Sequence, residues 1–139
     1  MAVVSSPMAT SDIDLSTCRI GPAAAVADMA RARAFYEGPL GLTAEEQQGG
    51  AVTYAFGSGT QLLIYPSPEN AGTSKATLAG IEVPDVEAAV EDLTARGVTF
   101  EQYAMGEIET DARGVADLGS FKSAWFKDPD GNIFAVAGG

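Results

Sequence analysis

The chain has 139 residues, a length that favours one domain, and its 46% of apolar residues suffice for a hydrophobic core. Its 19 acidic and 8 basic side chains give a formal net charge of −11, which argues against binding nucleic acid or anionic membranes, because phosphates need lysine and arginine. No histidine is present, which excludes the Ser-His-Asp triad, the Cys-His pair and every imidazole metal site.

The first predicted elements follow an N-terminal arm. Residues 1–16 contain no positively charged start and no long apolar run, so we expect a mobile arm and not a targeting signal. The single cysteine, Cys18, allows no internal disulfide and favours a reducing cytoplasm. A helix is predicted over 28–38, with Asp28 as its N-cap. Runs of β-branched and aromatic residues predict strands near 18–26, 42–48, 51–57 and 61–66.

The same order of elements returns after a linker, residues 67–75, that is rich in proline, serine and glycine. The second helix is predicted over 85–96, with Asp85 as its N-cap. The second set of strands is predicted near 76–83, 98–104, 121–127 and 132–137. The chain therefore repeats one βαβββ unit.

The second copy of this unit is longer than the first. The capping residues Asp28 and Asp85 are 57 positions apart, whereas the turn glycines Gly59 and Gly131 are 72 positions apart. The extra residues, about 15, fit the polar stretch 104–119, which we expect to form a long loop. Two roles stay open for it: a lid over a cavity, or a cover for a sheet edge or a dimer contact.

Three stretches carry a resemblance to a known family. One runs from Val26-Ala27-Asp28 to Leu40-Gly41-Leu42, and a second joins Ile81-Glu82-Val83-Pro84-Asp85 to Arg96-Gly97-Val98. The most specific is Ala124-Trp125-Phe126-Lys127-Asp128-Pro129-Asp130-Gly131-Asn132. From Arg19 to Ala137, the chain resembles the vicinal-oxygen-chelate superfamily of glyoxalases, bleomycin-resistance proteins and extradiol dioxygenases.

The resemblance implies an α+β fold in which two tandem βαβββ modules form a curled, half-open β-sheet cavity with flanking helices. It places a single domain at 17–139, with module one at 17–66 and module two at 76–137. Superfamily relatives often dimerise to complete their cavities, so the resemblance also implies a homodimer.

In metal-dependent relatives, four inward side chains hold a divalent ion. Carried over to this sequence, these positions are Gly21, Leu63, Leu78 and Ala135, none of which offers a donor atom. We therefore expect no metal, no other cofactor and no classical glyoxalase or dioxygenase activity. The acidic residues at 107, 109 and 111 lack the pattern of a calcium loop and are expected to be solvated.

Aromatic side chains on the predicted strands are candidates for the walls of a ligand pocket, although about half of such residues must belong to the core by strand alternation. The candidate ligand-binding residues are Tyr54, Phe56, Tyr65, Glu82, Tyr103 and Trp125. Ile81 and Val83 should face the helix, so Leu78, Gly80 and Glu82 should face the cavity. Glu82 is equally compatible with a position in solvent at the strand end.

The segment Asp128-Pro129-Asp130-Gly131-Asn132 resembles a catalytic motif but is predicted to be a turn. Proline fixes φ, glycine adopts positive φ, and the Asp and Asn side chains bond to nearby backbone.

These observations predict a metal-free protein that binds a small hydrophobic or aromatic molecule in the cytoplasm. One alternative is a lyase or isomerase without a metal, in which Glu82, Tyr65 or Tyr103 acts as acid or base. Another is a dimerising interaction protein whose cavity is filled by its own side chains. The expected partners are a small organic molecule and a second copy of the chain, with neither nucleic acid nor membrane.

Overall fold

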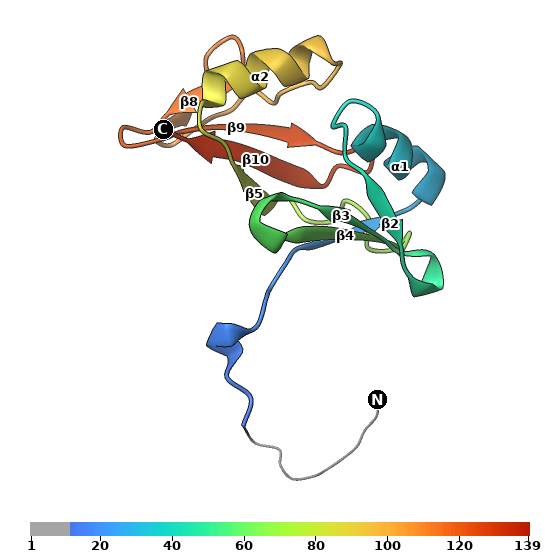
Figure 1. Cartoon of the computed structure of the whole chain (residues 1–139). Coiled ribbons are helices and arrows are strands. Elements are labelled where there is room, and N and C mark those ends of the chain that lie inside the picture. Colours follow the sequence, from blue (N-terminus) through green and yellow to red (C-terminus); the bar gives the residue numbers. More distant parts are fainter. Residues whose placement is uncertain (1–11) are drawn as a thin grey trace.

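The computed structural model describes residues 12–139 (Figure 1). Most of the predicted arm, residues 1–11, lies outside the described residues. The first module contains β1 (Ala23–Val26), α1 (Met29–Glu37), β2 (Ala44–Glu46), β3 (Val52–Ala55) and β4 (Gln61–Pro66). Its sheet has the order β1-β4-β3-β2, with β1 parallel to β4 and the other pairs antiparallel.

The second module repeats this topology. It contains β5 (Thr77–Glu82), α2 (Val86–Ala95), β8 (Val115–Asp117), β9 (Lys122–Lys127) and β10 (Ile133–Gly138). Its sheet has the order β5-β10-β9-β8, with β5 parallel to β10. A small hairpin of β6 (Ala104–Met105) and β7 (Ile108–Glu109) forms a separate sheet. The predicted α+β fold of two βαβββ modules is confirmed.

Each helix begins where a short carboxylate caps it. Asp28 Oδ1 accepts a hydrogen bond from the Arg31 amide at 3.1 Å, and Asp85 Oδ1 accepts one from the Ala88 amide at 3.1 Å. These bonds satisfy amide groups that have no partner within the helix. Both predicted N-caps are confirmed.

The strand predicted at 98–104 is wrong in its extent. Phe100 makes a single bridge to Phe126, and the Glu101 amide donates to the Trp125 carbonyl at 2.8 Å. The chain then leaves the sheet as the β6–β7 hairpin and returns as β8, inside the stretch predicted to be a loop. Two short segments, one at Phe100 and the other β8, therefore pair with β9, and the β6–β7 hairpin is inserted between them.

The strand predicted at 18–26 is also shorter than expected. Residues 18–21 are exposed, and β1 begins only at Ala23. Pro22 has no amide hydrogen to donate, and it joins the sheet only through its carbonyl, which accepts from the Leu63 amide at 3.1 Å.

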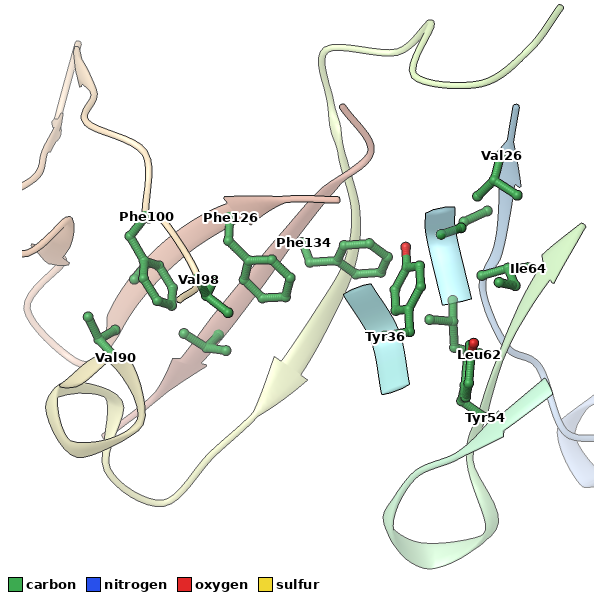
Figure 2. Close-up of a cluster of buried hydrophobic side chains, with 14 of the residues drawn as sticks. Val26, Tyr36, Tyr54, Leu62, Ile64, Val90, Val98, Phe100, Phe126 and Phe134 are labelled. Atoms are coloured by element: carbon green, nitrogen blue, oxygen red, sulfur yellow. The ribbon is translucent and has the colours of Figure 1, made fainter. Parts of the chain in front are cut away.

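One hydrophobic core extends through both modules on the helix side of their sheets. Figure 2 shows a row of side chains from Val90 on α2, through Phe126 and Phe134, to Tyr36 on α1 and Tyr54 on β3. The Tyr36 ring stacks on the Tyr54 ring, with centroids 5.4 Å apart. It also packs edge to face with the Phe134 ring, with centroids 6.0 Å apart. Helix α1 thus packs against both sheets.

The turn at residues 128–132 ties the modules together. Asp128 Oδ2 accepts from the Tyr36 hydroxyl at 2.6 Å, and the Asn132 side-chain amide donates to the Ala25 carbonyl at 2.8 Å. Arg31 donates to Asp130 Oδ1 at 2.7 Å. The predicted turn is confirmed, with Gly131 at φ 95°, and its polar side chains also bind β1 and α1 of the first module.

Candidate functional site

The candidate site is the face of the second sheet that points away from the helices. The register places Trp125 beside Ala135, Ala135 beside Gly80, and Ala137 between Ser123 and Glu82. Their neighbours along the strands belong to the main core, so these side chains point to the other side. We call this side the open face of module two; it comprises Gly80, Glu82, Ala116, Phe121, Ser123, Trp125, Ala135 and Ala137.

The β6–β7 hairpin covers one end of this open face. Tyr103 and Ile108 pack against a small cluster that includes Trp125 and Ala135. The Tyr103 and Trp125 rings meet edge to face, with centroids 5.4 Å apart. Burial, together with the nearby Glu101 carboxylate, raises the pKa of the Tyr103 phenol, which therefore stays neutral at physiological pH. The predicted long loop thus includes a cover for the aromatic part of the face.

The other end of the open face is hollow. A pocket of about 340 Å³ is lined by Gly80, Ile81, Glu82, Phe121, Ala137 and Gly138. A Cβ atom built on Gly80 would meet nothing within 4 Å, so the space above the strand is free. Among residues 12–139, Glu82 has neither an ion-pair partner nor a hydrogen-bond partner for its carboxylate. The carboxylate therefore stands at a solvent-accessible apolar hollow.

The first module carries an equivalent open face. Leu63 and Tyr65 alternate with the core residues Leu62 and Ile64, and they lie beside Ala23 and Ala25 of β1. Both side chains are half-buried, and neither belongs to the cluster around Trp125. The structure therefore places the candidates Tyr65 and Tyr103 on two different open faces.

The structure corrects the prediction that Tyr54 and Phe56 line the cavity. Tyr54 is completely buried in the main core, where its hydroxyl donates to Glu37 Oε2 at 2.9 Å, and Phe56 packs against the same core. Burial raises the pKa of the Tyr54 phenol above its usual range. Both residues lie on the helix side, because β3 turns its even-numbered positions toward α1.

Leu78 also departs from its expected orientation. The pairing of β5 with β10 shifts between Ile133 and Phe134, so Thr77 pairs with Ile133 and Ala79 with Phe134. Leu78 is the extra residue at this irregularity, and it packs against the main core instead of the open face. Gly80 and Glu82, beyond the shift, keep the orientation predicted for them.

The remaining positions carried over from metal-dependent relatives offer no donor atoms. Gly21 is exposed just before β1, whereas Leu63 and Ala135 lie on the two open faces. In residues 12–139, no group of three or more His, Cys, Asp or Glu side chains is arranged to hold a metal ion. The side chains at these positions therefore do not fit the family's divalent ion.

An ion-pair network joins the segment after the β6–β7 hairpin to Glu87 in the first turn of α2. Arg113 pairs with Asp111 at 2.8 Å and with Glu87 on α2 at 2.9 Å, and Lys122 donates to Glu87 at 3.2 Å. A wider groove of about 620 Å³ lies beside this network, over Val90 and residues 97–100. It lies on the helix side of the sheet, away from the aromatic open face.

Replacing Arg113 by alanine is expected to loosen the segment around the hairpin without unfolding either sheet. The change removes the bridge from Asp111 to α2, which holds the segment against the body. In hydrogen–deuterium exchange, amide protection at Thr110 and Val115 should fall about tenfold, while protection in β10 stays unchanged. Replacing Arg96 by alanine is the matched control, because it removes an exposed pair with Asp92 and a bond to the Pro39 carbonyl, neither of which involves this segment. Equal protection in both variants would contradict this role of Arg113.

Acid should loosen the same segment. The hydrogen bonds from Arg113 hold the pKa of both Glu87 and Asp111 below their ordinary values. Because these folded-state pKa values are lowered, the network is fully formed above about pH 4, the ordinary carboxylate range. Its contribution is lost as the pH falls through the lowered values. Exchange corrected for intrinsic rates should detect this loss in wild-type protein but not in Arg113→Ala.

Known proteins resemble this chain in sequence and in fold. The profile of the Glyoxalase/Bleomycin resistance protein/Dioxygenase superfamily matches residues 19–136. A glyoxalase/bleomycin resistance protein from Catenulispora acidiphila is 25% identical, with a TM-score of 0.62 and coverage of 88% of this chain and 99% of that one.

Two more distant structures share the fold. FosX, a fosfomycin resistance protein from Listeria monocytogenes, has a TM-score of 0.64 at 14% identity, covering 88% of this chain and 93% of that one. TnmS3, an antibiotic binding protein from Streptomyces sp. CB03234, has a TM-score of 0.62 at 21% identity, covering 88% and 97%. No curated protein matches the sequence significantly. Within residues 12–139, neither helix has the length and apolar character to cross a membrane.

Proposed function

The chain belongs to the glyoxalase/bleomycin resistance protein/dioxygenase superfamily, and from this premise we propose that it binds a small hydrophobic or aromatic molecule without a metal ion. The observation that carries the proposal is the open face of module two. There, the Trp125 and Tyr103 rings adjoin a sheet of small residues that ends in the Phe121 hollow. Aromatic walls with a few polar groups are typical of small-molecule sites.

The chemistry of the family's metal positions supports a metal-free site. Gly21, Leu63 and Ala135 leave no nitrogen, oxygen or sulfur side-chain donor where relatives place theirs. The fold shared with TnmS3, an antibiotic binding protein, supports sequestration as the mode of action. The fold shared with FosX is compatible with a role in resistance to a small toxic compound.

We also propose that the protein acts as a homodimer in the cytoplasm. A ligand on the open face of one chain would stay exposed on its outer side, whereas ligand sites normally bury most of the ligand surface. A second chain laid over the open faces would enclose the ligand.

The exposed thiol of Cys18, in a chain with no other cysteine, fits a reducing compartment.

Binding can be tested with a neutral aromatic dye, Nile red, because Trp125 is the only tryptophan. Dye binding should quench the Trp125 emission of the wild-type protein. Replacing Tyr103 by alanine should weaken dye binding about tenfold, because one aromatic wall is lost. Replacing Phe56 by alanine, which removes a core-side aromatic ring, should leave the affinity of the folded fraction unchanged. Equal losses in the two variants would contradict the assignment of the site.

Native mass spectrometry of the protein as purified, with metal analysis of the same sample, addresses the natural ligand. A bound organic compound at one equivalent per site supports the proposal and gives its chemical class. A stoichiometric divalent ion, or the absence of dye binding in the wild-type protein, would overturn it.

A second candidate is a metal-free enzyme, and the carboxylate of Glu82 is the observation that favours it. This carboxylate has no partner among the described residues, and it borders a hollow on the open face. A general base needs a carboxylate within hydrogen-bond reach of the substrate. If the compound found by mass spectrometry is converted on incubation, Glu82→Gln should abolish conversion and retain binding. Conversion at the wild-type rate would exclude Glu82 as the base.

A further inference from the structure

Residues 12–22 lead into β1 and display several exposed aliphatic side chains; we call this segment the arm from here on. Asp14 caps a 3-10 turn (Leu15–Thr17), accepting from the Ser16 amide at 3.0 Å and the Ser16 hydroxyl at 2.6 Å. Ile13, Leu15 and Ile20 are nevertheless 74%, 75% and 95% exposed. Single exposed apolar residues are normal, but three within eight residues form an apolar surface that gains free energy when covered.

The arm projects away from the body of the chain that carries it. Figure 1 shows it leaving β1 and running away from both sheets. Two hydrogen bonds fasten its base to β4 and the turn before it: Arg19 donates to the Gly59 carbonyl at 2.7 Å, and the Leu63 amide donates to the Pro22 carbonyl at 3.1 Å. The arm is therefore anchored at its root and free to contact another molecule along its length.

The open face of module two offers a complementary surface. The other two large hydrophobic residues exposed within 12–139 are Met105 on the β6–β7 hairpin, at 60%, and Phe121 in the hollow, at 43%. The chain thus carries exposed aliphatic residues on the arm and an exposed apolar hollow in the other module.

The charges beside these two surfaces also match. Arg19, directly before Ile20, pairs with no carboxylate within residues 12–139, and its bond to Gly59 uses one of its five N–H donors. Glu82, at the hollow, pairs with no base in the same part of the chain. A positive charge beside one apolar surface and a negative charge beside the other favour one register of the contact over all others.

We propose that the arm of one chain docks on the open face of module two of a second copy, with Ile20 over the Phe121 hollow and Arg19 paired with Glu82. This inference rests on the homodimer proposed above and adds the segment that forms it. In a two-fold dimer the exchange is reciprocal, so each arm covers the partner's hollow. The partner's arm then forms one wall of the ligand site, which is incomplete in a single chain.

Sedimentation velocity of the full chain without ligand tests the contact through a charge exchange. Arg19→Glu and Glu82→Arg should each weaken dimerisation about tenfold or more, because each places like charges together. The double variant R19E/E82R should recover most of the wild-type affinity. Lys75→Glu, a charge reversal in the exposed linker, is the matched control and should leave the dimer intact.

Two further measurements separate failure of the arm contact from failure of the dimer. Ile20→Asp, at a fully solvent-facing position, should keep the melting temperature of the isolated chain and dissociate the dimer. Cys18 should react with iodoacetamide more slowly in the wild-type dimer than in Arg19→Glu. A wild-type monomer would overturn both this inference and the homodimer. A dimer that persists unchanged in Arg19→Glu and Ile20→Asp would overturn the arm contact and leave the homodimer standing.

Discussion

Replacing Phe126 by alanine is expected to lower the free energy of unfolding by about 3–5 kcal/mol, the usual cost of removing a buried phenylalanine. Phe126 is completely buried, and its ring stacks on that of Phe134 with the centroids 5.6 Å apart. The ring centroids of Phe100 and of Phe35 on α1 lie 5.8 Å and 6.1 Å from that of Phe126. Its removal opens a cavity in the core that the two modules share. The melting temperature should fall by about 10–15 °C.

The matched control for this prediction keeps most of the volume of the side chain. Phe126→Leu should cost about 1.5 kcal/mol or somewhat more, since it leaves a smaller cavity. Chemical denaturation followed by circular dichroism measures both changes. A loss below about 1 kcal/mol for Phe126→Ala would show that the row of rings through both modules is not the central packing contact.

Replacing Asp128 by alanine is expected to destabilise the chain by about 3 kcal/mol or more, because it leaves several buried donors without an acceptor. Oδ1 accepts from the amides of Asp130 and Asn132, both at 2.9 Å. Oδ2 accepts from the Tyr36 hydroxyl at 2.6 Å and from the Asn132 side chain at 2.8 Å. The effect should exceed that of an ordinary turn residue, since the Tyr36 bond joins the two modules.

A double-mutant cycle isolates the bond between the modules. Tyr36→Phe alone should cost about 1–2 kcal/mol, and its cost should shrink when Asp128 is already alanine. Asp117→Ala, at an exposed carboxylate whose one side-chain bond within residues 12–139 is to the Gly119 amide, should change stability by about 0.5 kcal/mol. Additive effects of the Tyr36 and Asp128 substitutions would indicate that the turn stabilises module two alone.

Several parts of the fold could be predicted because their causes lie within a few residues of the chain. Asp28 and Asp85 bond to amides three residues ahead, so the sequence locates both helix starts. The turn at 128–132 is likewise made by bonds between near neighbours. The difference in spacing between the two copies placed the insertion in the stretch that holds the β6–β7 hairpin.

The candidate site was predictable only in part. Strand alternation oriented Glu82 correctly, because Ile81 beside it packs against the helix-side core. The same reasoning places Val52, Tyr54 and Phe56 on one face of the strand, but it could not decide between the core and the cavity, since an aromatic face suits both. The sequence oriented Gly80 and Glu82 but did not locate the hollow at Phe121, because its lining comes from β5, β10 and the residue before β9.

The sequence by itself determined the repeated βαβββ modules with their helix caps and turns, since each of these depends on residue type or on bonding between near neighbours. Only the tertiary structure decided which aromatic residues face the ligand side, that Leu78 turns into the core, and that the 128–132 turn binds α1. These features depend on pairings between strands and helices distant in sequence, such as the shifted register of β5 against β10. A single shifted pairing moves a side chain from one face of a sheet to the other, because successive side chains alternate between the two faces.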